Sequence, residues 1–138
     1  MKLFQQKTEI IQFDNVDTFL KEFTFESSDY IIASRSIYNA YFKEHNLPCK
    51  ITFHSDYGKG EPTDTMLDAM LKDVRKANPA RIIAIGGGSV MDCAKLFVFD
   101  GDDCAEDMFL QKCEYKKTRQ LITIPTTCGS GSEVSRIS

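Results

Sequence analysis

Residues 81–95 read RIIAIGGGSVMDCAK, an apolar run followed by three consecutive glycines, a serine and a stretch with helical spacing. A single glycine is enough to turn a strand sharply into a helix, because it reaches positive φ without penalty. Three in a row also expose successive backbone N–H groups and leave room for an anion at the helix N-terminus. The stretch therefore predicts a strand at 81–85, a helix at 89–99 and an anion-binding turn at 86–88, with a plain tight turn as the alternative.

Strand-like and helix-like segments alternate on both sides of this stretch. Short Ile-rich runs predict strands, and segment 63–77 has the i, i+3, i+4 apolar spacing of an amphipathic helix. The predicted strands cover 7–13, 30–34, 49–54, 81–85 and 120–124, the predicted helices cover 16–23, 36–45, 63–77 and 89–99, and 55–62 is a predicted polar turn. Strands connected by helices are typical of βαβ units, so we expect an α/β fold, a Rossmann-like doubly wound, mainly parallel sheet with flanking helices.

Composition narrows the functional class. The chain has 138 residues, the size of one domain (1–138), and its net charge of −3 is not gathered into blocks, which argues against nucleic acid or a membrane surface as partner. No apolar run approaches the roughly 20 residues that span a bilayer, and no signal peptide is recognisable. Five cysteines without C-x-x-C spacing favour reduced thiols and a cytoplasmic protein. The two histidines, His45 and His54, lack metal-ligand spacing, so we expect no metal centre made from this chain alone.

The glycine turn differs from two familiar phosphate-binding motifs. A G-x-G-x-x-G fingerprint would need a glycine in place of Met91, and the G-K-[ST] of a P-loop is absent. Ser89 and Asp92 have the S-x-x-D spacing of a capping box, which predicts that the helix starts at Ser89.

A second segment follows the strand predicted at 120–124. It reads PTTCGSGSEVSRIS (125–138), in which a proline ends the strand and hydroxyl residues then alternate with glycines. These hydroxyl residues are Thr126, Thr127, Ser130, Ser132 and Ser135. Short donors beyond the carboxyl end of a strand suit hydrogen bonds to phosphates and ribose, while a solvent-exposed loop or linker is the alternative.

Together the two segments resemble a known family. The patterns G-G-G-S-x-x-D-x-A-K at 86–95 and P-T-T-x-G-[ST]-G-S-E-V-[ST] at 125–135 resemble the iron-containing (group III) alcohol dehydrogenases, in the same order and with the same flanking strands. The resemblance extends over essentially the whole chain and matches the nucleotide-binding half of that family.

The resemblance implies a cofactor, NAD or NADP, and a small alcohol or aldehyde substrate. The residues implied in cofactor binding are Gly86, Gly87, Gly88, Ser89, Asp92, Thr126, Thr127, Ser130 and Ser34, with Ser135 a weaker candidate and Lys95 by default on the helix surface. In that family a helical C-terminal domain holds Fe²⁺ through one aspartate and three histidines. This chain matches none of that domain, so no catalytic or metal residue is assigned here, and Fe²⁺ (or Zn²⁺) is expected only through residues outside it.

Two positions depart from the family pattern. Members that prefer NAD often carry an acidic residue after the first α/β strand, whereas Ser34 and Arg35 stand here. A missing carboxylate and a nearby guanidinium make NADP at least as well suited as NAD. Glu61 replaces a frequent asparagine, which puts a contact from that turn in doubt.

The extent of the chain leaves further readings open. It ends three residues after the second motif, so we expect a fragment of a longer protein that is inactive alone. The alternatives are a free-standing nucleotide-binding or regulatory module without catalysis, or a related zinc-dependent polyol dehydrogenase. A homo-oligomer is also left open.

Overall fold

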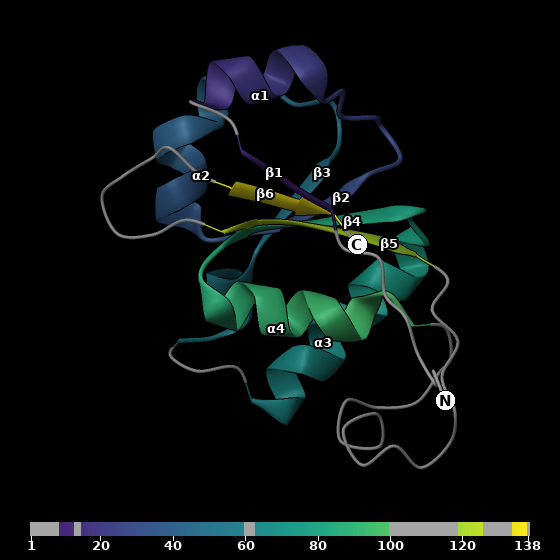
Figure 1. Ribbon diagram of the computed structural model, residues 1–138. Helices are drawn as coiled ribbons and strands as arrows, with labels where there is room; N and C mark the ends of the chain where they lie inside the picture. Colours follow the sequence, from purple (N-terminus) through teal and green to yellow (C-terminus); the bar gives the residue numbers. More distant parts are fainter. Residues whose placement is uncertain (1–8, 13–14, 60–62, 100–118, 126–133, 138) are drawn as a thin grey trace, which may run out of the picture.

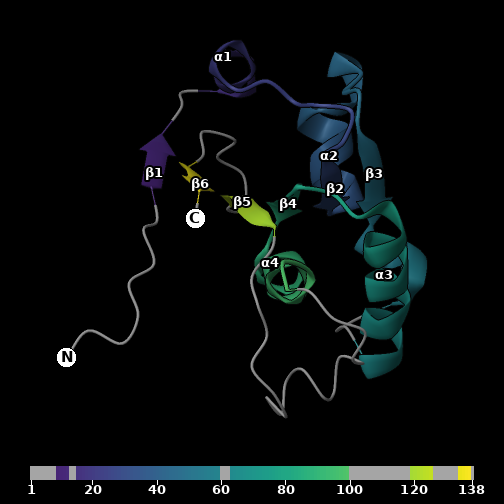
Figure 2. The same cartoon turned by 90° about the vertical axis from the view of Figure 1, so that its right-hand side faces the viewer.

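The fold is built on one six-stranded sheet. The computed structural model describes residues 9–12, 15–59, 63–99, 119–125 and 134–137. The elements are β1 (Glu9–Gln12), α1 (Val16–Glu22), β2 (Tyr30–Ala33), α2 (Arg35–Tyr41), η1 (Lys43–His45), β3 (Lys50–Phe53), η2 (His54–Tyr57), α3 (Asp64–Ala77), β4 (Arg81–Gly86), α4 (Gly88–Phe97), β5 (Gln120–Pro125) and β6 (Val134–Ile137). The strand order is β1-β6-β5-β4-β2-β3, which Figure 2 shows across the sheet.

Four neighbouring strands are parallel. β3, β2, β4 and β5 pair in parallel, while β6 runs antiparallel to β5 and β1 antiparallel to β6. Helices cover both faces, with α1 and α2 on one side and α3 and α4 on the other (Figure 1). This arrangement confirms the α/β fold with a mainly parallel sheet. None of the helices in the described part of the chain is long and apolar enough to cross a bilayer.

Alternate residues of the central strands point to opposite helix layers, as the period of two requires. Toward α1 and α2 the sheet buries Ile31, Ala33, Ile83, Ile85, Ile122 and Ile124, and these pack with Phe19 and Tyr38. Toward α3 and α4 it buries Tyr30, Ile32, Ile82, Ala84 and Leu121, and these pack with Met70, Val74 and Phe97. Burial on both faces explains the continuous apolar runs in β2 and β4.

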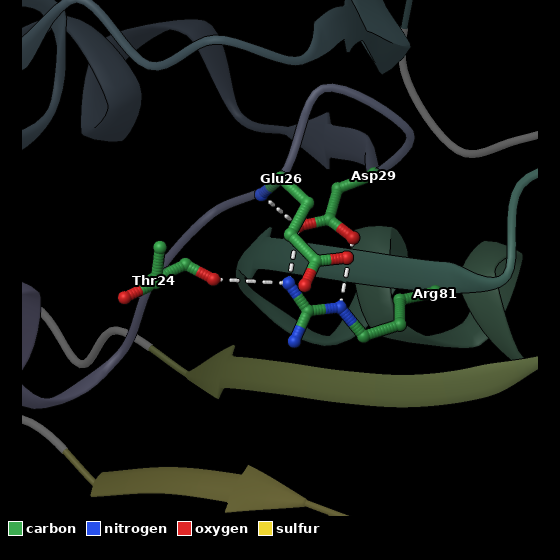
Figure 3. Close-up of polar contacts among 4 residues, drawn as sticks. All are labelled: Thr24, Glu26, Asp29 and Arg81. Atoms are coloured by element: carbon green, nitrogen blue, oxygen red, sulfur yellow. Dashed lines mark hydrogen bonds and ion pairs between the residues drawn. The ribbon is translucent and has the colours of Figure 1, made fainter.

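An ion pair fixes the amino-terminal edge of the sheet. Arg81, the first residue of β4, donates to the Asp29 carboxylate through Nε at 2.8 Å and Nη2 at 2.5 Å, and to the Thr24 carbonyl at 3.1 Å (Figure 3). Asp29, which is 1% exposed, also accepts a hydrogen bond from the backbone N–H of Glu26 at 2.8 Å. The cluster thus ties the segment before β2 to the start of β4.

A buried arginine connects the ends of two helices to β5. Arg119, 6% exposed, donates to the carbonyls of Phe97 at 3.0 Å and Phe99 at 3.2 Å. It also donates to Asn78 Oδ1 at 3.2 Å, and Asn78 is the left-handed C-cap residue of α3. Arg119 therefore satisfies carbonyls at the end of α4 that the helix itself leaves unpaired.

Three expected boundaries differ from the structure. The helix expected at 36–45 is divided into α2 and η1, because the chain changes to a 3₁₀ turn that ends at Asn46 in the left-handed conformation. The polar turn expected at 55–62 begins as the short helix η2. The loop expected at 125–138 contains the strand β6, and Pro125 ends β5 as expected.

Candidate functional site

Gly86 is the last residue of β4, and the fold requires a glycine there. Its φ of +146° lies in a region that L side chains rarely adopt. A Cβ at this position would lie 3.2 Å from Ser34 Cβ and 3.2 Å from Val90 Cγ2. Gly86 therefore allows β2, β4 and the first turn of α4 to approach closely.

The next two glycines have a different character. Gly87 has an extended backbone (φ −88°, ψ −167°) and is the N-cap of α4, and Gly88 is the first helical residue. A Cβ added to either would meet no atom within 4 Å. Neither close packing nor a positive φ requires glycine at these two positions. The missing side chains leave open space at the N-terminus of α4, a helix of 10 residues. Bare backbone at a helix N-terminus fits a phosphate group.

The capping-box prediction was wrong. The helix begins at Gly88, one residue earlier than the start predicted at Ser89, and its N-cap is Gly87. The Asp92 carboxylate lies 3.5 Å from the Lys95 ammonium, and these side chains are 76% and 67% exposed. Asp92 thus forms a surface ion pair one turn along the helix, and Lys95 lies on the helix surface. The side chain of Ser89 lies outside the described part of the structure.

Ser34 lies beside the glycine turn on the neighbouring strand end. It follows β2, is the N-cap of α2, and donates its backbone N–H to the Ile85 carbonyl at 2.9 Å. Its hydroxyl lies 3.3 Å from that of Ser36. The structure therefore brings Ser34 next to Gly86, as a shared binding edge would require.

Arg35 has partners that the sequence analysis missed. Its guanidinium forms an ion pair with Asp56 and lies 4.2 Å from the centroid of the Phe53 ring. Phe53 ends β3, and Asp56 follows it in η2. The sequence places each of these residues shortly after a predicted strand, but their pairing depends on β2 and β3 being neighbours in the sheet.

The two sequence motifs start side by side. In the β4–β5 ladder Gly86 is the partner of Pro125, so the glycine turn and the hydroxyl-rich segment leave adjacent strands at the same edge. The predicted contacts Thr126, Thr127 and Ser130 lie outside the described residues, as does Glu61. Ser135 belongs to β6 and pairs with Ile11 of β1. It is thus part of a strand, and not of a loop as the sequence suggested.

The Cys93 thiol in α4 belongs to the hydrophobic core beneath this edge. Burial raises the pKa of the Cys93 thiol in α4 to about 11, and the nearby Asp92 charge adds to the rise. At neutral pH Cys93 is therefore a protonated, apolar core residue. In the parts of the chain that the structure describes, no group of three or more His, Cys, Asp or Glu side chains could hold a metal ion.

Comparison with solved structures agrees with this fold. The crystal structure of YqhD from Escherichia coli K-12 superposes with a TM-score of 0.56 at 14% identity, over 89% of this chain and 38% of that one. The substrate- and cofactor-free form of the aldehyde reductase YqhD from E. coli gives a TM-score of 0.54 at 14% identity, over 85% and 36% of the two chains. At this identity the likeness shows the fold alone.

Sequence comparison shows the family. A 4-hydroxybutyrate dehydrogenase from Clostridium kluyveri is 37% identical over all 138 residues, which cover 37% of that protein. An alcohol dehydrogenase from Thermococcus barophilus is 37% identical over 87 residues, covering 56% of this chain and 23% of that protein. The chain thus spans well under half the length of these relatives. The family profile described as "Iron-containing alcohol dehydrogenase" matches residues 8–138. The chain therefore belongs to the iron-containing alcohol dehydrogenase family.

Proposed function

We propose that this chain is the NAD(P)-binding part of a dehydrogenase that oxidises a small alcohol or hydroxy acid, or reduces the matching aldehyde. The observation that carries the proposal is the pair of open glycines, Gly87 and Gly88, at the start of α4. They lie beside the point where the second family motif leaves β5, because Gly86 and Pro125 are ladder partners.

Each residue of the site has a defined part in this proposal. Backbone N–H groups at Gly87 and Gly88 bind the pyrophosphate, supported by the positive end of the α4 dipole. Gly86 permits the close approach of Ser34. In this proposal Ser34 takes the adenosine side of the cradle. Asp92 and Ser89 are retained as candidate contacts near the loop, and Thr126, Thr127 and Ser130 as contacts from the β5 side. When bound, the nicotinamide ring supplies the hydride acceptor or donor.

The metal implied by the family does not fit the described residues of this chain. No cluster of suitable ligands occurs among them, and we therefore propose that Fe²⁺ (or Zn²⁺) is held by a part of the protein that this chain does not include. The substrate class to test first is a hydroxy acid, since the relative that matches along the whole chain is named a 4-hydroxybutyrate dehydrogenase.

The test uses the complete protein encoded by the gene that contains this sequence. NADH and NADPH binding is measured by the fluorescence of the reduced nicotinamide, and turnover is measured with 4-hydroxybutyrate and simple primary alcohols after loading with Fe²⁺ or Zn²⁺. We expect nucleotide binding and metal-dependent turnover. Binding without turnover under any metal would favour a nucleotide-binding module, and the absence of all nucleotide binding would refute the proposal.

A further inference from the structure

The short helix η2 lies at the same edge of the sheet as the glycine cradle. It directly follows β3, while Gly87 and Gly88 follow β4, and β2 lies between these two parallel strands (Figure 2). Ligands of open α/β sheets bind outside the carboxyl ends of the strands, and two interstrand spacings amount to about 10 Å. A nucleotide that binds its phosphate at the cradle and extends over the end of β2 therefore reaches η2.

Tyr57, the last residue of η2, belongs to a chain of hydrogen bonds that runs into the core. Its hydroxyl donates to Asp73 Oδ2 in α3 at 2.5 Å. The Tyr57 oxygen is also hydrogen-bonded to the Tyr30 hydroxyl of β2, and Thr52 Oγ1 of β3 donates to the Tyr30 oxygen at 2.9 Å. Because each hydroxyl has one proton, the chain of donors runs in one direction, from Thr52 through both tyrosines to the carboxylate.

Two further contacts fix the ends of η2. Gly58, which follows Tyr57, has a φ of +155°, and a Cβ there would lie 2.8 Å from Met66 Sδ. Only glycine allows the chain to leave η2 so close to α3. At the other end of η2, His54 Nδ1 lies 3.4 Å from the carbonyl of Ala33, the last residue of β2. The turn is therefore attached to both β2 and α3.

This chain of hydrogen bonds is more than a surface turn needs. Hydroxyls and a carboxylate that leave the solvent must all be paired, and a fully paired network makes the surrounding structure rigid. A rigid turn benefits a ligand, because binding to a mobile turn would first have to order its backbone. The hydrogen bonds therefore favour a ligand that meets η2 at the edge of the sheet.

We propose that Tyr57 and Asp73 are positioning residues for nucleotide binding, whose hydrogen bond holds η2 where the adenosine end of the dinucleotide meets it. The inference rests on the proposed function, in which the adenosine lies on the Ser34 side of the cradle. Neither residue touches the nucleotide, and both act through η2, where Ser55 and Asp56 are exposed. Because adenosine is common to NAD and NADP, the effect is the same for both cofactors.

The test compares the two halves of the cofactor on the complete protein encoded by the gene that contains this sequence. Calorimetry measures the affinities of 5′-AMP and of reduced nicotinamide mononucleotide, which carry the same phosphate on different nucleosides. We expect Tyr57→Phe, which keeps the ring and removes the hydroxyl, to weaken 5′-AMP about threefold to tenfold and to leave the nicotinamide mononucleotide unchanged. Equal weakening of both halves would indicate a general loss of structure and refute the inference.

Variants of Asp73 test the other partner of the same bond. Asp73→Ala should weaken 5′-AMP as much as Tyr57→Phe does, and the double variant should bind it no more weakly than either single variant, since both break one bond. Asp73→Asn keeps an oxygen that accepts from Tyr57, so it should retain most of the wild-type affinity. Additive losses in the double variant, or equal losses in Asp73→Asn and Asp73→Ala, would contradict the role given to this hydrogen bond.

Thr52→Val is the matched control. It removes a buried hydroxyl from the same chain of hydrogen bonds but leaves the bond between η2 and α3 in place. It should lower the midpoint of urea unfolding and leave the affinity for 5′-AMP unchanged. If it weakens 5′-AMP as much as Tyr57→Phe does, stability alone sets the affinity and the inference fails.

The same measurements separate the inference from the proposed function. Urea unfolding shows that each variant is folded, and if Tyr57→Phe does not fold, the Asp73 variants provide the same comparison. Wild-type affinity for 5′-AMP in folded Tyr57→Phe or Asp73→Ala protein refutes the inference alone. If the wild-type protein binds neither half of the cofactor nor NADH, the proposed function fails as well.

Discussion

Arg81 and Asp29 form a two-point ion pair that joins residues 52 positions apart at the amino-terminal edge of the sheet. The Asp29 side chain is 1% exposed and that of Arg81 is 20% exposed. The hydrogen bond that Arg81 donates to Asp29 is the main reason that the pKa of the Arg81 guanidinium is raised. This pair lies at the opposite edge of the sheet from the glycine cradle, which separates its effect on stability from any effect on binding.

Asp29→Asn should therefore destabilise the fold without altering the cradle. Removal of one partner from a buried pair leaves the other charge without compensation, and we expect a loss of about 3 kcal/mol in the free energy of unfolding. Urea denaturation measures this loss. An unchanged dependence of the free energy of unfolding on urea concentration would show that the same unfolding transition is compared. Asp92→Asn is the control, because it makes the same chemical change in an exposed pair and should cost at most about 1 kcal/mol. Equal losses in both variants would contradict a special role for the buried pair.

Of the three consecutive glycines, the fold should need Gly86, and the ligand should need Gly87 and Gly88. Gly86→Ala places a side chain at φ +146° and 3.2 Å from Ser34 Cβ, so we expect a destabilisation of about 1–3 kcal/mol. Gly88→Ala meets no neighbouring atom and occupies the first helical position, so the stability should change by less than about 0.5 kcal/mol.

Nucleotide titration completes this comparison. Gly88→Ala should weaken NADH and NADPH binding about tenfold or more, because its Cβ occupies the space proposed for the pyrophosphate. Thermal unfolding of the same samples shows whether each variant is folded. If a folded Gly88→Ala protein binds the cofactor with unchanged affinity, the pyrophosphate does not bind at this turn.

Alkaline pH should weaken the fold through its buried thiols. Burial raises the pKa of Cys49 and Cys93 from 9.0 to about 11 in each case. Between these values the folded state keeps protons that the unfolded state has released, so stability falls as the pH rises. We expect a level free energy of unfolding below about pH 9, and a loss on the order of a few kcal/mol between about pH 9 and 11. The buried tyrosines Tyr30 and Tyr38 and the partly buried Tyr57, whose pKa values burial also raises, extend the loss above pH 10.

Unfolding in urea at a series of pH values measures this dependence. A Cys49→Ala/Cys93→Ala variant is less stable at neutral pH because of the lost packing, but its stability should fall less steeply between about pH 9 and 10. A steeper fall in that variant, or a rise of wild-type stability across the window, would contradict the assignment.

Arg119 should stabilise the fold through the hydrogen bonds that it donates at the end of α4, and not through its charge alone. Arg119→Met keeps much of the volume but leaves the Phe97 and Phe99 carbonyls without their donor, and we expect a loss of about 2–4 kcal/mol. Arg119→Lys keeps the charge but not the planar fork that serves three acceptors, so it should recover only part of the loss. Full recovery with lysine, measured by denaturant unfolding, would show that charge alone matters.

The sequence predicts the elements of this fold well where the signal is local. The apolar runs of β2, β4 and β5, the spacing of α3 and the sharp turn after β4 each depend on neighbouring residues, and the structure contains all of them. The sequence predicts the start of α4 one residue too late, at Ser89 and not at Gly88. Gly87 adopts the N-cap conformation, which makes a serine cap unnecessary.

Contacts between residues that are distant in the sequence cannot be predicted from such local patterns. The pairing of Arg35 with Asp56 spans 21 residues, and it depends on β2 and β3 being neighbours in the sheet. The sequence predicts a loop where β6 lies, because its hydroxyl-rich surroundings have weak strand propensity. In the structure β6 is a strand because it pairs with β1 and β5. The site residues Thr126, Thr127 and Ser130 stay predictions.

The pairing of β1 with β6 joins residues far apart in the sequence, such as Glu9 with Ile137. Within the described sheet, β1 is one of the two edge strands and reaches the other strands only through β6. A contact between residues so far apart in sequence carries a high entropic cost of loop closure and forms late in folding. During synthesis β1 must therefore wait, unpaired in this sheet, until residues 134–137 have been made. In hydrogen exchange, the backbone amides of β1 and β6 should exchange together, as one cooperative unit, and faster than the amides of the parallel strands.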